Sequence, residues 1–437
     1  MLNETIDTPP ITAVDEARPT RWAWVILLAL ILMTAGGLRL VLTPLQEAAK
    51  HDLHFTDLQI GMLQGFAKGL PIAVFALPVG LAIDHLDRTR VMLFLALCWT
   101  SGTILTAFSY SFEALFAARM LVGLGSGSAL AVAMSIIADL CAPHRRGRVL
   151  LVAGIGAWTG TALAFALGGA LFGYFSTHGW SFFPDMAAWR LTTLAFGIFG
   201  VAMLIPIAMF REPERHEREQ RNNAMLPALK GLLSRWRFLV PLFLGQMAGG
   251  MAEGASGIWA APVLQRQYGL TPDQFGGWMG GMILVSGILG SVLGGVSADW
   301  GQNSSRRGGI MIGAVVATAF TIPAAAYPVM PNVAWFGLAL GVLLLGCTVA
   351  QLVGLTAVTV LIPNEERGVC MAIIGVIGTV VGLGTAPLVA ELGTAVLGSE
   401  ERLPEALALV GVATGVLALA GYVITMLAAP ARRAAAA

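Results

Sequence analysis

The sequence predicts an all-α polytopic membrane protein whose twelve transmembrane helices form two six-helix pseudo-repeats. Of the 437 residues, 57% are hydrophobic and only 12% are charged, about half the charged fraction of a soluble protein. Long apolar stretches recur along the chain, and each has about 20 residues or more, enough to cross the hydrocarbon core of a bilayer. Two pairs of similar segments lie at nearly the same offset, which is typical of a duplicated unit.

The two pairs of segments are short but agree with each other. A Gly and an Asp four residues later end an apolar run at residues 80–84, and the same spacing returns 215 residues later, at 295–299. The segment PHRRGR at 143–148 is echoed by PNEERG at 363–368, an offset of 220 residues. The shared offset indicates a duplicated half of about six spans.

The apolar stretches give the expected spans in order. They cover residues 23–47, 57–83, 91–110, 113–140, 149–176 and 189–210, and then 238–264, 273–298, 309–328, 332–361, 368–397 and 404–428. The chain thus divides into an amino-terminal tail (1–22), a first bundle (23–210), a linker (211–237), a second bundle (238–428) and a carboxyl-terminal tail (429–437). The linker is polar, and its last part, 226–237, is expected to form an interfacial helix. Residues 1–20 lack the basic start and short apolar core of a cleavable signal, so the first span is expected to act as an uncleaved one.

The basic residues predict the orientation. Of the 26 Lys and Arg residues, 19 fall on one side of the expected spans, in the tails, the linker and alternate loops. The loops on the other side contain only Lys50, Arg190, Arg266 and Arg402. Basic residues accumulate in cytoplasmic loops, so we expect a multi-pass protein of the cytoplasmic (inner) membrane with both termini in the cytoplasm.

Three further basic residues, Arg39, Lys68 and Arg119, fall inside spans. A basic side chain near the middle of a span costs about 2.5–3.5 kcal/mol on insertion scales, so such residues normally face a cavity or a partner. Glu253 is the acidic residue deep in the second half, and its offset of 214 from Arg39 matches the repeat. Uncharged polar residues lie on the same helix faces or at mid-span, namely Gln64, Ser126, Gln246 and Gln351.

The loop after the second span carries a family signature. Gly80, Asp84, Arg88 and Arg90 resemble the signature loop between helices 2 and 3 of the major facilitator superfamily, although residues 85, 87 and 89 depart from it. This resemblance implies the major facilitator fold, in which spans 1, 4, 7 and 10 line a central cavity.

Several segments of the first half resemble one branch of that superfamily. The runs RMLVGLG at 119–125, SIIAD at 135–139 and RRGR at 145–148 are similar to the Spinster-like branch and its bacterial relatives. Two positions depart from this branch, because Leu38 and Ser126 stand where it usually has carboxylates associated with proton coupling. The lipid-like substrates of the branch are therefore not carried over, and any proton coupling must use Glu253 or a group that the sequence does not identify.

The resemblance implies that Arg39, Arg119, Glu253 and Gln351 face the cavity, with Lys68 beside them. Three cations against one acid would form a pocket for a carboxylate, phosphate or sulfonate. A structural alternative pairs Glu253 with Arg39, leaves Lys68 to bond backbone carbonyls and makes Arg119 an internal strut. We expect the substrate site to comprise Arg39, Gln64, Lys68, Arg119, Ser126, Gln246, Glu253 and Gln351.

Charged residues at the loop ends have a different expected role. Clusters of this kind pair when the cytoplasmic side is closed and separate when it opens. The expected gating residues are Asp84, Arg88, Asp139, Arg145 and Asp299, with a pair between Asp84 and an arginine of the 145–148 segment as the candidate gate. The alternative is a solvated surface whose ion pairs each contribute little.

The functional prediction is a secondary active transporter that moves a small organic anion or anionic amphiphile by alternating access, coupled to protons. Two alternatives remain open: a lysolipid or drug exporter of the Spinster-like type, and a non-transporting membrane sensor with the same fold. We found no nucleotide-binding loop, metal cluster or nucleophile–base pair, so we expect no enzyme, no ATP-driven pump and no cofactor. The bilayer, protons and a small-molecule substrate are the expected partners of a monomer, and no basic patch predicts nucleic-acid binding.

Overall fold

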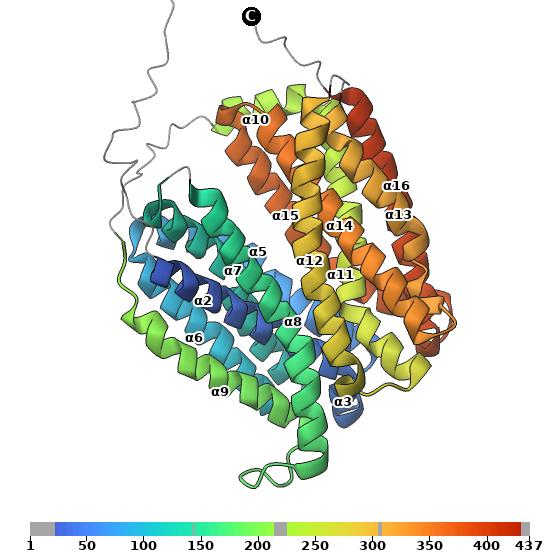
Figure 1. The fold of residues 1–437 in the computed structure, drawn as a ribbon. Helices are drawn as coiled ribbons and strands as arrows, with labels where there is room; N and C mark the ends of the chain where they lie inside the picture. Colours follow the sequence, from blue (N-terminus) through green and yellow to red (C-terminus); the bar gives the residue numbers. More distant parts are fainter. Residues whose placement is uncertain (1–21, 143–144, 214–224, 305–307, 430–437) are drawn as a thin grey trace, which may run out of the picture.

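The computed structural model describes residues 22–142, 145–213, 225–304 and 308–429, and this part of the chain is helical without a strand. Both predicted tails lie almost wholly outside the described residues, as does the part of the predicted linker at 214–224. Twelve long helices form two groups of six, which Figure 1 shows at the left and at the right. Short segments join helices that are adjacent in the sequence within each group.

The helix bounds follow the predicted spans closely. The first group comprises α2 (Trp22–Leu40) with α3 (Leu42–Leu53), α4 (Asp57–Gln64) with α5 (Phe66–His85), α6 (Arg88–Ala107), α7 (Phe112–Leu140), α8 (Arg146–His178) and α9 (Ala188–Met209). The second comprises α11 (Trp236–Tyr268), α12 (Pro272–Asn303), α13 (Ile312–Ala324), α14 (Val333–Leu361), α15 (Asn364–Glu391) and α16 (Leu403–Ala428). The prediction of twelve spans in two six-helix repeats is therefore confirmed.

The hydropathy of α11 differs from that of the other long helices. Eleven helices or helix pairs are long and apolar enough to cross a membrane, and α11 is the one of the twelve that is missing from that set. Its 33 residues include Gln246, Glu253, Gln265 and Arg266, which lower its hydropathy. Because α11 packs along α16 and α14, these polar groups lie among protein atoms and not in lipid.

The first span is longer than predicted. It continues past residue 47 as α3, after an interruption at Val41, and ends at Leu53. The extension was missed because α3 carries polar residues, yet Gln46 and Glu47 are buried. They face the second half of the protein. The helix therefore extends beyond the apolar stretch from which its length was predicted.

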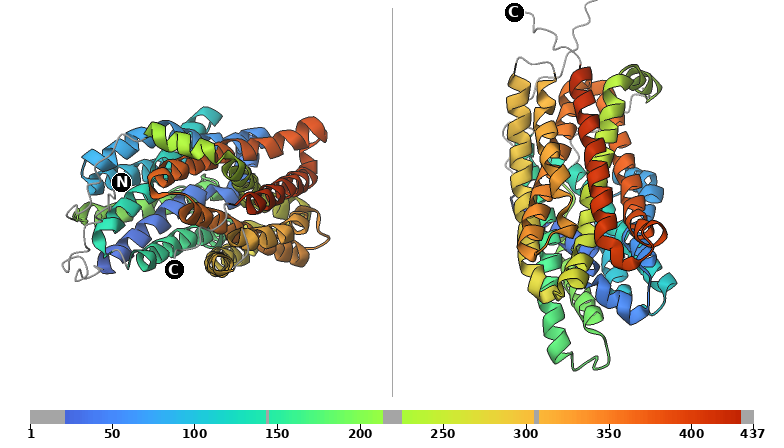
Figure 2. Two further views of the ribbon diagram at one scale, coloured as in Figure 1. Left: turned by 90° about the horizontal axis from the view of Figure 1, so that it is seen from above. Right: turned by 90° about the vertical axis from the view of Figure 1, so that its right-hand side faces the viewer.

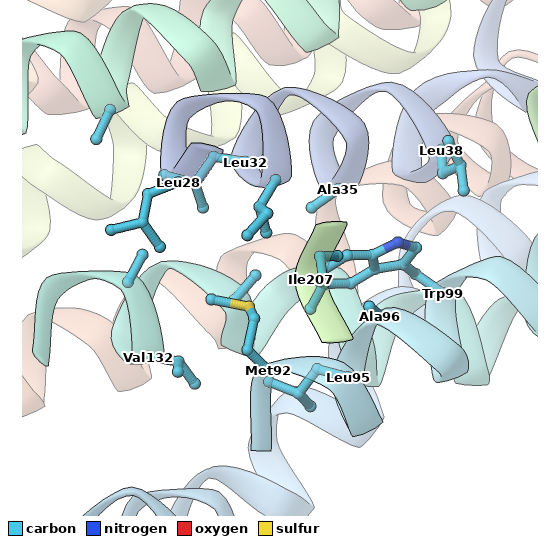
Figure 3. Packing of buried hydrophobic residues seen from close by; sticks show 14 of the residues in the cluster. Leu28, Leu32, Ala35, Leu38, Met92, Leu95, Ala96, Trp99, Val132 and Ile207 are labelled. Carbon is cyan, nitrogen blue, oxygen red and sulfur yellow. The ribbon is translucent and has the colours of Figure 1, made fainter. Parts of the chain in front are cut away.

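The core of the first half shows how an apolar helix divides its faces between protein and lipid. Leu28 and Leu32 of α2 lie one turn apart on the same face and point into a buried apolar cluster that also contains Met92 of α6 and Val132 of α7 (Figure 3). Ile26 and Leu30, on another face of α2, are 54% and 39% exposed. Exposed large apolar side chains occur on the long helices of both halves, as expected of a surface that meets hydrocarbon.

The two halves are in contact mainly at one face of the molecule. We name the face where α2 begins and α16 ends the terminal face, and the face where α8 and α11 end the opposite face. Near the opposite face α8 packs on α12, and α4 and α5 pack on α15. A Cβ atom at Gly169 or Gly276 would overlap a backbone carbonyl of the facing helix, so glycine allows this close approach of α8 and α12.

Toward the terminal face the two halves separate. At Gly375 and Gly378 of α15, a Cβ atom would meet no atom within 4 Å, and α5 residues from Val74 onward are largely exposed. The two groups of helices lean apart toward the top of Figure 1, where α16 ends, and the side view in Figure 2 shows the same face at the top. The contacts between halves are thus concentrated on the opposite face.

A short helix, α10 (Met225–Ser234), lies across the terminal face beside the start of α15 (Figure 1). It occupies most of the segment 226–237 that was expected to form an interfacial helix, but it ends at Ser234. The chain bends at Arg235, and Trp236 begins α11. The Arg235 Nε atom lies 3.2 Å from a carboxylate oxygen of Glu366, which joins this bend to α15.

Candidate functional site

A cavity of about 550 Å³ lies between the two halves. Its walls come from α2, α4, α5, α7 and α8 of the first half and from α11, α12, α14 and α15 of the second. Five of the residues predicted for the substrate site line it, namely Arg39, Gln64, Lys68, Ser126 and Glu253. The structure therefore brings together polar groups that are separated by up to about two hundred residues in the sequence.

The first-half wall of the cavity is cationic. Lys68 Nζ donates a hydrogen bond of 2.6 Å to Gln64 Oε1. Arg119 is 0% exposed and donates from Nη2 to the backbone carbonyl of Arg39, at 2.5 Å, while its Nε and Nη1 atoms have no hydrogen-bond partner. No ion pair with a described residue is formed by Arg39, Lys68 or Arg119. Positive charge therefore accumulates behind and beside Arg39 without a protein counter-ion.

Local backbone features place Lys68 in this wall. The helix of the second span is interrupted at Gly65, which ends α4 and precedes α5. A Cβ at Gly65 would overlap backbone atoms of Leu383 on α15, and one at Gly123 would overlap the backbone of Lys68. Glycine at these two positions lets the neighbouring helices hold the Lys68 backbone tightly, while the side chain reaches the cavity.

The second-half wall contributes one acid, several apolar side chains and the hydroxyl groups of Ser256, Ser286 and Thr348. Glu253 of α11 lines the cavity and makes no hydrogen bond or ion pair with a described residue. The apolar part of this wall comes from Ile258, Met279, Ile283, Leu340 and Leu344, and Trp158 of α8 adds an aromatic ring from the first half. The ion pair between Glu253 and Arg39 that the sequence left open is not formed in this structure. The charges of the cavity are thus divided, with the cations in the first half and the carboxyl group of Glu253 in the second.

Three predicted site residues lie outside this lining. Arg119 is buried behind Arg39, as described above. Gln246 and Gln351 each donate a side-chain hydrogen bond to the other's backbone carbonyl, both at 3.1 Å, and the Tyr422 hydroxyl donates to Gln246 Oε1. These amides tie α11 to α14 and α16 within the second half. The expectation that Arg119, Gln246 and Gln351 face the cavity is therefore corrected: the two glutamine amides are engaged in bonds within the second half, and Arg119 is held behind Arg39 by its bond to the Arg39 carbonyl.

The predicted gating residues lie at the terminal face. Arg88, at the start of α6, donates from Nη1 to Asp139 Oδ2 at 2.6 Å and from Nε to Glu212 Oε1 at 2.8 Å. The Nη1 atom also donates to the carbonyl of Ser135. Asp139 and Ser135 lie in the first bundle and Glu212 follows that bundle at the start of the linker, so these bonds of Arg88 do not join the two bundles. The remaining predicted gating residues lie at helix ends on the same face, namely Asp84, Arg145 and Asp299.

An ion network on the opposite face was not predicted as a site. Arg266, near the end of α11, donates to both oxygens of Glu47, at 2.9 and 2.6 Å, and to both oxygens of Asp57, at 2.7 and 2.6 Å. Lys50 donates to Asp57 Oδ1 at 2.6 Å and also to Glu400. Glu47, Lys50 and Asp57 come from the first half, and Arg266 and Glu400 come from the second. We call these five residues the opposite-face network.

The start of α4 helps to assemble this network. Thr56 caps the helix, and its side chain accepts a hydrogen bond from the Gln59 backbone. The backbone N–H of Asp57 donates to Glu400 Oε1 at 3.0 Å, so an acidic side chain of the other half meets the positive end of α4. The sequence offered one signal for this network, since Lys50 and Arg266 are two of only four basic residues in the opposite loops.

Comparison with known proteins agrees with this architecture. The family model of the Major Facilitator Superfamily matches residues 25–387. A bacterial homologue of the human lysosomal transporter Spinster, solved in an inward-facing and unoccupied conformation, has a TM-score of 0.78 and 19% identity, over 94% of this chain and 97% of that chain.

Two curated relatives match this chain over different lengths. The probable 4-methylmuconolactone transporter of Cupriavidus pinatubonensis is 25% identical over 346 residues, which cover 78% of this chain and 76% of that protein. Protein spinster homolog 1 of Xenopus tropicalis is 27% identical over 265 residues, covering 56% of this chain and 48% of that protein. The family match covers most of the chain, and the fold agrees with it. This chain therefore belongs to the Major Facilitator Superfamily of membrane transporters.

Proposed function

We propose that this protein is a secondary active transporter that carries a small organic carboxylate with an apolar body across the cytoplasmic membrane. The observation that carries the proposal is the cationic wall formed by Arg39 and Lys68, with Arg119 buried behind Arg39; these cations have no counter-ion among the described residues. Cations buried without a partner are costly in a membrane, so an anionic ligand that pairs with them would be bound favourably.

The chemistry of the cavity favours a carboxylate. The Arg39 guanidinium can hold a carboxylate with two parallel hydrogen bonds, and the Lys68 amine adds a point charge. Apolar side chains of both halves, such as Trp158 of α8 and Ile283 of α12, provide contact for a ring or a short hydrocarbon. The relative from Cupriavidus pinatubonensis is named for 4-methylmuconolactone, a small lactone that carries a carboxylate, and this supports the same substrate class.

Alternating access would move this ligand between the two sides. The halves are joined at the opposite face and apart at the terminal face, so the cavity communicates with the side on which α2 begins and α16 ends. With both termini in the cytoplasm, as the basic residues predict, this arrangement is an inward-open state. Rocking of the halves about the cavity would break the opposite-face network and bring the terminal ends together.

Glu253 is the proposed proton carrier. Its carboxyl group lines the cavity across from the cations and has no described partner, so it can take up and release a proton without breaking an ion pair. A Glu253→Gln variant is expected to retain carboxylate exchange between equal concentrations but to lose uphill uptake driven by a proton gradient. Uphill uptake at the normal rate would contradict the proton role of Glu253, but it would not contradict the proposal for the anion site.

Proteoliposome uptake of radiolabelled benzoate tests the anion site directly. Replacement of Arg39 or Lys68 by Ala is expected to reduce uptake by at least about a hundredfold, the effect of losing a charged contact worth about 3 kcal/mol. Arg237→Ala, which removes an exposed cation from the start of α11, is the matched control and should transport normally. Normal uptake by folded protein in both cavity variants would refute the proposal.

A second candidate function is the export of an anionic amphiphile. A hollow of about 210 Å³ between α5 and α15 shares Arg39 and Lys68 with the central cavity and is otherwise bordered largely by glycines. An acyl chain could leave the cavity through this gap while the charged headgroup stays at the cations. Lysophosphatidylglycerol should then compete with benzoate and stabilise the protein, and Gly378→Leu should block the lipid but spare benzoate.

A further inference from the structure

A buried chain of hydrogen bonds leads from the cavity to the other half of the protein. Lys68 Nζ donates to Gln64 Oε1 at 2.6 Å, Gln64 Nε2 donates to Gln46 Oε1 at 2.6 Å, and Gln46 Nε2 donates to the carbonyl of Ile258 at 2.7 Å. The side chains of this chain are buried, with residue exposures of 4% for Lys68, 3% for Gln64 and 0% for Gln46. We call this series of bonds the Gln46 relay.

The two ends of the relay fix the direction of both amides. A lysine ammonium group can only donate hydrogen bonds, and a backbone carbonyl can only accept them. Gln64 must therefore turn its oxygen to Lys68 and its nitrogen to Gln46, and Gln46 must turn its nitrogen to Ile258. If either amide were flipped, like groups would face each other in a buried site, so the relay has a single ordered arrangement.

A proline makes the last acceptor available. In a regular α-helix the carbonyl of Ile258 would accept a bond from the N–H group four residues later. That residue is Pro262, which lies inside α11 and has no N–H group. The freed carbonyl is satisfied by Gln46 of α3, a residue of the other half. The relay is therefore complete only while the halves are together at the opposite face.

We propose that Gln46 is a positioning residue through which closure of the opposite face orients the Lys68 amine in the cavity. When the halves separate there, Gln46 loses its acceptor on α11, and the amides that hold Lys68 lose their fixed direction. Lys68 then presents its amine differently in the two states. A ligand that contacts Lys68 would therefore bind the two states with different affinities. Such a difference is required for a ligand to shift the equilibrium between states.

Lysine acylation tests the relay without any ligand. The chain has only three lysines, Lys50, Lys68 and Lys230, so the acetylation of each by acetic anhydride can be followed by mass spectrometry. Gln46→Met keeps the side-chain length and removes the hydrogen bonds. We expect the acetylation rate of Lys68, relative to Lys230, to rise about three- to tenfold, the effect of losing about one hydrogen bond.

The control variant removes a bond of the same kind from the same contact between the two halves, which we call the seam. Gln265 Nε2 donates to the carbonyl of Pro44 in the other half, at 3.2 Å, but it has no link to Lys68. Gln265→Met should therefore leave the relative rate at Lys68 unchanged. An unchanged rate in Gln46→Met, or an equal rise in both variants, would overturn the inference, because the effect would then be absent or would reflect only a looser seam.

Benzoate affinity provides a second readout, and this one rests on the proposed function. By calorimetric titration, Gln46→Met should weaken benzoate binding by about the same factor as it speeds acylation, and Gln265→Met should bind as the unaltered protein does. If the unaltered protein binds no benzoate, the carboxylate proposal fails, and the acylation result still decides the relay. Equal affinity in the unaltered protein and in Gln46→Met would refute the coupling.

Discussion

Two arginines at opposite faces of the molecule have nearly the same chemistry and different consequences. Arg88 binds Asp139 and Glu212 at the terminal face, and Arg266 binds Glu47 and Asp57 at the opposite face. The carboxylates of Arg88 belong to its own half, whereas those of Arg266 belong to the other half.

The comparison teaches that the position of a pair relative to the seam decides whether it acts as a gate. An ion pair within one half is kept in every position of the rocking halves, so its loss lowers the stability of that bundle. A pair across the seam exists only in one state, so its loss shifts the equilibrium between states. The four predictions that follow separate these two effects, and they begin with the largest.

The largest effect is expected from Arg266→Met. Glu47 and Asp57 are buried and would lose their shared cation, a loss that typically costs about 3–5 kcal/mol. The state closed at the opposite face should become correspondingly less populated. A cysteine at Gly257, where a Cβ would meet no atom within 4 Å, reports access to the cavity in a variant without the four native cysteines.

The measurement is the reaction of that cysteine with an impermeant thiol reagent added outside intact cells. The reaction should be at least about a hundredfold faster in Arg266→Met than with the Gly257→Cys change alone. Equal rates would show that the opposite-face network does not hold the halves together.

Arg88→Met should have a smaller effect of a different kind. It removes the bonds of the Arg88 guanidinium to Asp139 and Glu212, and we expect the free energy of unfolding to fall by about 2–3 kcal/mol. Thermal unfolding in detergent measures this loss. The outside reaction of the Gly257→Cys thiol should not change, and an increase like that of Arg266→Met would remove the distinction between the two faces.

Lys50→Met removes the second cation of the opposite-face network. Asp57 keeps Arg266, and Glu400 is partly exposed, with 34% side-chain exposure, so water can replace its partner. We expect a shift of about 1 kcal/mol, which makes the outside thiol reaction about fivefold faster. A shift as large as that of Arg266→Met would mean that Lys50, and not Arg266, is the main contact across the seam.

The smallest effect is expected from Arg235→Gln. Its pair with Glu366 joins the bend after α10 to α15 within the second half, and the arginine side chain is 38% exposed. Such pairs contribute about 0–1 kcal/mol. The midpoint of thermal unfolding should fall by no more than a few degrees, and benzoate transport should remain normal. A strong loss of transport would indicate that α10 controls the movement of α15.

Several residues that line the cavity could be singled out from the sequence because each is unusual on its own. Arg39, Lys68 and Glu253 could be singled out from a single fact, their place inside apolar spans, since a charge at that depth requires a cavity or a partner. Gln246 and Gln351 are uncharged but also lie inside spans, yet their side chains bond each other's backbone and do not line the cavity. Whether a polar side chain faces a cavity or a neighbouring helix depends on the rotation of its helix, and apolar spans without a strong polar face do not reveal it.

The sequence by itself therefore determined the number of spans, the repeat and the presence of buried charge, because these follow from local composition and from similarity at a fixed offset. Only the tertiary structure decided the partners. The bonds of Arg266 to Glu47 and Asp57 join residues 219 and 209 positions apart, and that of Lys50 to Glu400 joins residues 350 apart. Such pairs form only when two separately folded bundles meet, and no local pattern of residues specifies how two bundles meet.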